Sequence, residues 1–112
     1  MGIQNWSETI ILVNLASEPQ MGEELQTAVD MVRRRCRDIV VDFSEVDIIT
    51  SSSIAKLLKL RKIVVIARQH KLRICGVNTH VWGVFLVTGL DKIFDVYNDV
   101  ASGLASLHLG GK

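Results

Sequence analysis

One continuous segment, residues 39–58, restricts most strongly what this chain can fold into. It begins with Ile39 to Phe43, a run rich in β-branched residues that shows no apolar–polar alternation. Such a run is typical of a strand buried on both faces, at the centre of a sheet. A short acidic loop follows, and Ser51, Ser52 and Ser53 then open a long apolar stretch. The segment therefore predicts a central strand, a loop, and a helix that carries hydroxyl groups at its N-terminus.

The rest of the chain repeats this alternation of strand and helix. Runs of β-branched residues predict strands, and apolar residues that recur at helical spacing predict helices. We expect strands at residues 9–15, 39–43, 72–77 and 94–97, and helices at 21–36, 52–69, 79–87 and 99–107. The alternating order predicts an α/β domain with mostly parallel central strands.

The apolar positions of these segments predict the core. The residues expected to be buried are Ile39, Val41, Leu58, Ile74, Val84 and Leu104. In the 52–69 helix, the expected inner side is Ile54, Leu57, Leu58, Val65 and Ala67. The residues expected to remain in solvent are Lys56, Lys59, Lys62 and Arg68. Further apolar residues widen the stripe, so this helix either lies deep in the domain or offers surface to a partner.

Length and composition narrow the class of protein. A chain of 112 residues predicts one domain over residues 1–112, with a core at about 9–107. The net charge of +1 gives no overall attraction to nucleic acid or to an anionic membrane. Cys36 and Cys75 lack a CxxC spacing and no signal peptide is evident, so we expect reduced thiols and a cytoplasmic protein. No run reaches the ~18 apolar residues of a membrane span, so direct membrane insertion is not expected.

Candidate metal and catalytic residues form no convincing pattern. His70, His80 and His108 have no ligand spacing with the two cysteines, so no metal is expected. Ser52 has no nearby histidine in a nucleophile-elbow pattern, and no glycine-rich phosphate loop is present. We therefore expect a non-enzymatic protein without a cofactor. Asp42, at the end of the central strand, is expected to fix the following loop by accepting backbone N–H bonds.

A basic run, Arg33 to Arg37, ends the first predicted helix. Cations complement a helix C-terminus, which is the simplest interpretation. The alternative is a basic patch for an acidic partner or a nucleic acid. No aromatic residues interleave with the arginines, which favours the simpler interpretation, and no nucleic-acid partner is expected.

Trp82 presents a second choice between packing and binding. Val81, Val84 and Phe85 suffice for the inner face of the 79–87 helix. Trp82 therefore fits an apolar patch for a partner or a second copy better than it fits local half-burial. We expect its ring to be substantially exposed in the isolated chain.

The serines Ser51, Ser52 and Ser53, together with Thr50, allow two interpretations. A helix start leaves N–H groups unpaired and carries partial positive charge, so a hydroxyl there caps the helix. Capping needs only one hydroxyl, and four are present. Residue types alone favour a redundant cap. A phosphate would also be electrostatically favoured at this position, so a phosphorylation switch is the alternative.

The segment resembles the signature of STAS domains, the fold of bacterial anti-sigma factor antagonists. Members carry Asp-Ser-Ser/Thr-Gly-Leu-Gly at the start of a helix, and Thr50 to Ala55 lies on this motif. Within residues 81–94, Val87 to Asp91 looks like the family's later Leu-Thr-Gly-Leu-Asp helix end. The resemblance covers roughly residues 10–107. It implies an α/β STAS fold, a four- to five-stranded mixed sheet with about four helices packed mainly on one face.

The resemblance also implies a function. It suggests a regulatory binding protein that sequesters an anti-sigma factor acting as a serine kinase, while a serine phosphatase restores the unmodified form. Ser52 lies at the family's phosphorylated position, with Ser51 and Ser53 as lesser candidates. The partner surface would comprise Thr50, Ser51, Ser52, Ser53, Lys56 and Trp82. A homodimer stays open.

The sequence also departs from the family pattern. The leading Asp of the motif is Thr50 here, and its glycines are Ser53 and Ala55. Where relatives carry Gly-Glu-Leu-Asp after the first strand, this chain has residues 17–20, Ser-Glu-Pro-Gln. Two alternatives therefore stay open: a constitutive STAS scaffold, and a regulatory subunit or accessory of a lipid or anion transport system in a membrane.

Overall fold

The computed structural model describes residues 2–17 and 19–109. Its strands are β1 (Gly2–Asn5), β2 (Ile10–Ala16), β3 (Asp38–Glu45), β4 (Leu72–Cys75) and β5 (Asp95–Tyr97). Its helices are α1 (Gln20–Arg34), α2 (Ser51–Arg61), α3 (Thr79–Thr88) and α4 (Val100–Leu109). A π-helical segment, η1 (Lys62–Ala67), continues α2, and a 3-10 turn, η2 (Leu90–Lys92), follows α3.

The strands form one mixed sheet in the order β1-β2-β3-β4-β5. The pair β1–β2 is antiparallel, and every later neighbour is parallel. The predicted α/β class and the central position of β3 are confirmed. Our sequence analysis missed β1, because this short segment begins with a glycine and has only one β-branched residue, Ile3.

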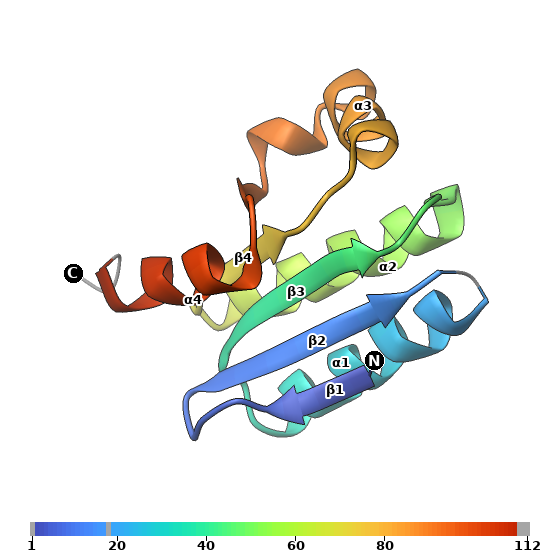
Figure 1. Cartoon of the computed structure of the whole chain (residues 1–112). Coiled ribbons are helices and arrows are strands. Elements are labelled where there is room, and N and C mark those ends of the chain that lie inside the picture. Colours follow the sequence, from blue (N-terminus) through green and yellow to red (C-terminus); the bar gives the residue numbers. More distant parts are fainter. Residues whose placement is uncertain (1, 18, 110–112) are drawn as a thin grey trace.

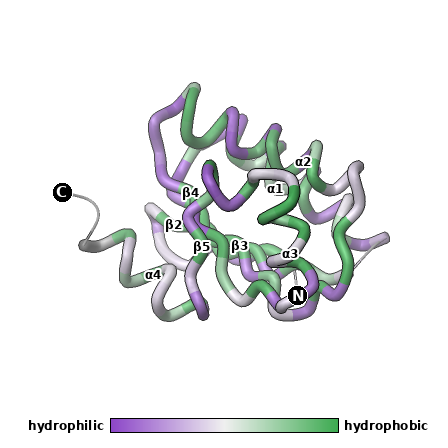
Figure 2. Tube along the Cα trace, turned by 90° about the horizontal axis from the view of Figure 1, so that it is seen from above, coloured by the Kyte–Doolittle hydropathy of each residue, from purple (hydrophilic) through white to green (hydrophobic). Residues whose placement is uncertain are grey.

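The helices lie in two unequal layers. In Figures 1 and 2, α1 and α2 lie on one side of the strands and α4 lies on the other. The larger core cluster joins α1, α2 and α3 to alternate strand residues such as Val13, Val41 and Ile74. The smaller cluster, beneath α4, includes Leu12, Val40 and Cys75. The prediction of helices mainly on one face is therefore confirmed.

Three of the six predicted core residues, Ile39, Val41 and Ile74, are fully buried. Val84 and Leu104 are only partly buried, and Leu58 is exposed, so its prediction was wrong. The buried stripe of the α2 and η1 segment is Leu57, Leu60 and Val64. Residues 57 and 58 differ by about 100° around a helix, so burying Leu57 turns Leu58 outward.

The π-helical segment explains a second error. Arg68 N–H donates to Ile63 O, 3.1 Å away, across five residues instead of four. A π-helical turn shifts every later side chain around the axis relative to a regular α-helix. The predicted inner side, which assumed one α-helix to residue 69, therefore fails at its end, where Ala67 is exposed. Val65 and Ile54 are partly buried.

Candidate functional site

The candidate site is the N-terminus of α2, which follows β3 at the edge where the parallel strands end. We call this edge the carboxyl edge. Thr50 is the N-cap residue, with extended backbone angles. Its Oγ1 accepts a hydrogen bond from Ser53 N–H at 3.1 Å, and Ser53 Oγ accepts one from Thr50 N–H at 2.8 Å. This reciprocal arrangement is a capping box, in which serine occupies the usual Glu or Gln position.

The capping box separates the roles of the three serines. Ser53 is 1% exposed, and its hydroxyl also donates to Thr50 O at 2.9 Å. Ser51 and Ser52 are exposed, and within the described part of the chain their hydroxyls make no hydrogen bond. Ser53 therefore serves as a cap, while Ser51 and Ser52 present free hydroxyl groups on the first turn of α2.

Contacts from two other elements hold the loop before α2. Ser17, just after β2, donates from its Oγ to Glu45 O and accepts from Asp47 N–H, both at 3.1 Å. Asn78, the N-cap of α3, donates from Nδ2 to Val46 O at 3.1 Å. The loop thus lies between the start of α1 and the start of α3, so the site is a fixed surface. Ser17 belongs to the run that aligns with Gly-Glu-Leu-Asp, but its contact with Asp47 was not predicted, because no local pattern signals a contact 30 residues away.

A shallow hollow of about 270 Å³ lies beside the cap, lined by Ser17, Asp47, Ile48 and Thr50. Ile48 is 59% exposed, which is unusual for a large apolar side chain in a loop. Ile48 was not among the predicted site residues. The available signal for it was the pair Ile48-Ile49 immediately before Thr50 and the three serines.

Asp42 acts within β3 and not on the following loop. Its Oδ1 accepts from Ser44 N–H at 3.0 Å and from the Ser44 hydroxyl. Its Oδ2 accepts from Asn14 Nδ2 at 2.9 Å. The expectation of accepted backbone N–H bonds holds for Ser44 alone, because the carboxylate points across the sheet toward β2. Asp42 thus links the ends of β2 and β3.

The other predicted partner residues lie at different distances from the serines. Lys56, one turn along α2, is half-buried, and its Nζ donates to Gly22 O at 3.4 Å. Trp82 is 37% exposed and lines a separate hollow of about 370 Å³ between α3 and the end of β5. The structure therefore groups Thr50, the serines and Lys56 on α2 and places Trp82 on a neighbouring surface.

Two titratable groups near this edge, Cys75 and Asp99, have shifted pKa values. Burial raises the pKa of the Cys75 thiol to about 12, with Asp42 and Asp99 adding to the shift. Hydrogen bonds from Ser102 lower the pKa of Asp99, whose Oδ1 accepts from Ser102 N–H at 2.8 Å. Cys75 therefore stays protonated near neutral pH and is a poor nucleophile.

The described residues are those of 2–17 and 19–109, with the side chains of 108 and 109 excluded. They contain no cluster of three or more histidine, cysteine, aspartate or glutamate side chains that would hold a metal ion; the His108 side chain lies outside them. Among the helices of residues 2–17 and 19–109, none has the length and apolar character needed to cross a membrane.

Comparison with known proteins agrees with this architecture. The model of a family described as the STAS domain matches residues 7–103. The chain belongs to the STAS domain family. Among the curated proteins, none is significantly similar to it in sequence.

Several solved structures share the fold. An anti-sigma-factor antagonist (STAS) domain protein from Planctomyces limnophilus is 17% identical and covers 96% of this chain and 99% of its own, with a TM-score of 0.81. The anti-sigma factor antagonist SpoIIAA in its unphosphorylated form is 10% identical, with coverages of 98% and 97% and a TM-score of 0.72. A sulfate transporter family protein from Wolinella succinogenes is 16% identical, with coverages of 90% and 84% and a TM-score of 0.73.

Proposed function

We propose that this STAS domain is a non-enzymatic regulatory protein of the anti-sigma factor antagonist type. Its carboxyl edge binds an anti-sigma factor that is also a serine kinase, and phosphorylation of Ser52 releases that partner. The proposal rests on the different roles of Ser52 and Ser53 at the start of α2. Ser53 holds the helix cap, which leaves the exposed Ser52 hydroxyl free for modification.

The position suits a charge-controlled switch. The N–H groups of Ser51 and Ser52 belong to the unpaired donors of the first helical turn. A phosphate adds about −1.5 to −2 charges, which such a helix end accommodates without a change of fold. A partner docked over the same turn would face a new desolvation and repulsion cost, so its affinity would fall.

The proposed partner surface has two parts. Thr50, Ser51, Ser52 and Lys56 form the α2 part, with the buried Ser53 as its support. The second part is the outer side of α3, where Trp82, Leu86 and Val87 are exposed and no residue of the helix is charged. Exposed apolar side chains on an uncharged helix favour a protein partner. A cytoplasmic serine phosphatase would restore the unmodified form.

A second candidate function rests on two observations. The motif lacks its leading Asp and its glycines, and a sulfate transporter family protein shares the fold. The chain would then serve a membrane transport system for lipids or anions, or act as a constitutive scaffold that is never phosphorylated.

The test combines modification with binding. Ser52→Asp should keep the fold, because an anion suits a helix N-terminus, and should weaken capture of the native partner. Ser51→Asp, an equally exposed neighbour, is the matched control and should weaken capture less. Mass spectrometry of the chain purified from its host should find phosphoserine at position 52. Equal capture by both variants, an absence of phosphoserine, and a transport subunit as the captured protein would favour the second candidate.

A further inference from the structure

The two edges of the sheet carry opposite charge. At the carboxyl edge, acidic residues lie at the start of α1, after β3 and before α4; they are Glu23, Glu24, Glu45, Asp47 and Asp99. Among the described residues, Lys56 in α2 is the cationic side chain close to this acidic group. At the opposite end, where β2 to β5 begin, basic residues gather from the end of α1 with its connection to β3, and from the connection between η1 and β4; they are Arg33, Arg34, Arg35, Arg37, Arg68 and Lys71. We call this end the amino edge.

An exposed tryptophan belongs to the amino edge. Trp6, in the turn between β1 and β2, is 52% exposed. Arg37 Nη1 donates to Asn5 Oδ1 at 2.6 Å, and Arg35 Nη2 donates to Glu8 O at 2.9 Å, so two arginines hold this turn from both sides. In the sequence, no aromatic residue interleaves with these arginines. In the fold, the turn that carries Trp6, about 30 residues earlier in the chain, lies against Arg35 and Arg37.

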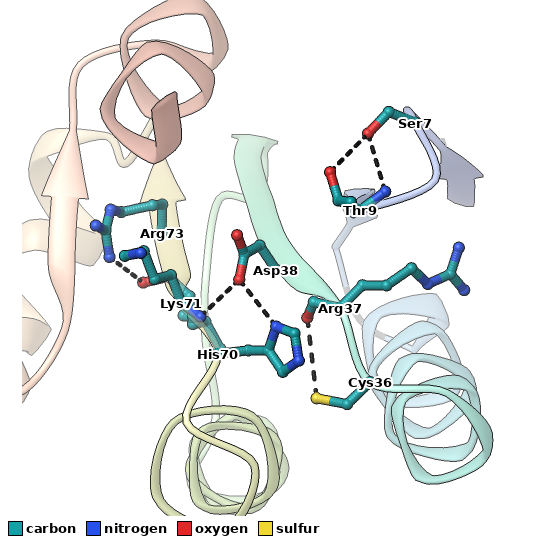
Figure 3. Close-up of polar contacts among 9 residues, drawn as sticks. Ser7, Thr9, Cys36, Arg37, Asp38, His70, Lys71 and Arg73 are labelled. Atoms are coloured by element: carbon teal, nitrogen blue, oxygen red, sulfur yellow. Dashed lines mark hydrogen bonds and ion pairs between the residues drawn. The ribbon is translucent and has the colours of Figure 1, made fainter. Parts of the chain in front are cut away.

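The acidic side chains of this edge include Glu8, which is exposed in the same turn as Trp6, and Asp38, which is engaged within the domain. Asp38 Oδ1 accepts from Lys71 N–H at 2.9 Å and lies 3.1 Å from His70 Nδ1, as Figure 3 shows. Figure 3 also shows the turn of Ser7 and Thr9 on the same side as Arg37. Trp6 is therefore an apolar projection within a cationic surface.

The carboxyl edge offers the complement. The hollow lined by Ser17, Asp47, Ile48 and Thr50 is apolar at Ile48 and acidic at Asp47. Within residues 2–17 and 19–109, no cation pairs with the Asp47 carboxylate. Its volume of about 270 Å³ is many times the roughly 10–15 Å³ that one water molecule needs in the same measure, so it has room for a larger group such as an aromatic ring.

We propose that the chain self-associates head to tail through these two edges. Trp6 of one copy occupies the hollow at Ile48 of the next copy, and Arg35 and Arg37 face the carboxylates of Glu45 and Asp47. A tryptophan in a pocket surrounded by charge pairs is a common arrangement at binding hot spots. The two contacting surfaces differ, so the contact is heterologous and adds copies instead of closing at two.

Charge complementarity identifies a second copy as the occupant. A net charge of +1 provides little overall attraction to a polyanion, whereas the matching acidic surface exists on the same chain. The contact would also cover the exposed Ser51 and Ser52 beside the hollow. Self-association and binding of a partner at α2 would then exclude one another.

Sedimentation velocity of the full chain tests the proposal. The average mass should rise with concentration beyond that of a dimer at about 0.1 M salt, where charges act over roughly 10 Å, and fall toward a monomer at about 1 M, where they act over roughly 3 Å. Trp6→Ala should weaken the association roughly tenfold or more, the loss typical of a hot spot. Trp82→Ala, which removes the other exposed tryptophan, should leave it unchanged.

A mixing experiment decides the geometry. Trp6→Ala keeps an intact hollow, and Asp47→Arg keeps an intact Trp6, so each variant alone should be largely monomeric. Mixed in equal amounts they should form a complex that stops at two copies. A monomeric wild type, a mixture that stays monomeric, or a wild-type dimer that does not grow would overturn the proposal. Binding of Trp6 to anionic lipid vesicles or to DNA without self-association would also overturn it. A monomeric chain that binds its partner through α2 would leave the proposed function standing.

Discussion

The carboxyl and amino edges are formed by the same four parallel strands, yet many of the side chains that hold the backbone there differ in kind. Each edge also has side chains of the other kind, such as Asn78, which donates to Val46 O, and Asp38, which accepts from Lys71 N–H. At the carboxyl edge, the oxygens of Ser17, Thr50, Asn78 and Asp99 accept backbone N–H bonds. At the amino edge, Arg35 and Arg68 donate to the carbonyls of Glu8 and Arg33.

Helix direction explains the difference. In a strand–helix–strand unit, each helix begins at the carboxyl edge and ends at the amino edge. Its start exposes unpaired N–H groups and needs acceptors, and its end exposes unpaired carbonyls and benefits from cations. The helix ends follow this rule in part: Glu23 lies in the first turn of α1 and two arginines lie in its last turn, whereas the cap of α2 is the neutral Thr50. Any function of either edge uses groups that the fold already requires.

The largest effect is expected from a substitution in β3, the central strand that runs between the two edges. Val41 is fully buried in β3, so Val41→Asp would place an unpaired charge in the centre of the sheet and cost about 4 kcal/mol or more. Both edges should then lose structure together in a chemical denaturation curve. Val87→Asp is the control, because Val87 is 88% exposed and the change should cost no more than about 0.5 kcal/mol. Similar midpoints for the two variants would disprove the central position of β3.

A glycine at the carboxyl edge gives the next largest effect. Gly76 has a φ of +74°, and a Cβ there would lie 2.7 Å from Ser44 Oγ and 2.9 Å from Asp42 Oδ1. Gly76→Ala should therefore lower the free energy of unfolding by about 2 kcal/mol or more. Gly83→Ala in α3 is the control, since its Cβ would meet nothing within 4 Å. It should raise stability by about 0.5–1 kcal/mol through helix propensity. If both substitutions stabilise, the turn after β4 is not as described.

The serines at the carboxyl edge should differ in their contribution to stability. Ser53→Ala removes half of the capping box and leaves Thr50 N–H without its acceptor, which should cost about 1 kcal/mol. Ser52→Ala removes an exposed hydroxyl without a partner and should change stability by less than about 0.5 kcal/mol. Urea midpoints of the two variants give the comparison. A larger loss at Ser52 would make it the cap and would contradict its role as the free hydroxyl.

The smallest effect is expected in a turn of the amino edge. Gln69 has a φ of +59°, a conformation that costs a non-glycine residue about 1 kcal/mol. Gln69→Gly should therefore stabilise the chain by a few tenths to about 1 kcal/mol, because the strain relieved exceeds the added flexibility. Arg68→Gly serves as the control, since it removes the bond to Arg33 O from a residue with negative φ and should destabilise. Thermal melting in parallel would show a shift of the wrong sign if the turn carried no strain.

Local signals in the sequence were enough for most of the fold. A strand without alternation at 39–43, a further strand at 72–77, and helices between them predicted an α/β domain with mostly parallel central strands, which the structure confirms. Boundaries moved by at most two residues, except in the helix predicted at 52–69, where α2 ends at Arg61 and a π-helical segment follows. The STAS resemblance added the topology, because two motifs at a fixed spacing specify more than either alone.

The candidate site was predicted only in part. The motif located the serines on the first turn of α2, but residue types could not distinguish among three adjacent serines. Their exposure depends on how α2 rotates when Leu57 and Leu60 pack into the core. The same rotation exposed Leu58, which the pattern had placed inside, and the later π-helical turn exposed Ala67.

The sequence by itself determined most of the elements, their order, and the opposite charges at the two ends of α1, because these depend on neighbours within a few residues. Tertiary structure decided which hydroxyl caps α2, where Asp42 points, and that Trp6 lies among the arginines. The capping box joins Thr50 and Ser53, which are only three residues apart, so the choice of hydroxyl depends on how α2 packs. The other two outcomes depend on contacts between residues about 30 positions apart, such as Asn14 with Asp42 and Arg37 with Asn5. The closure of the sheet brings such residues together, and no local pattern in the chain records it.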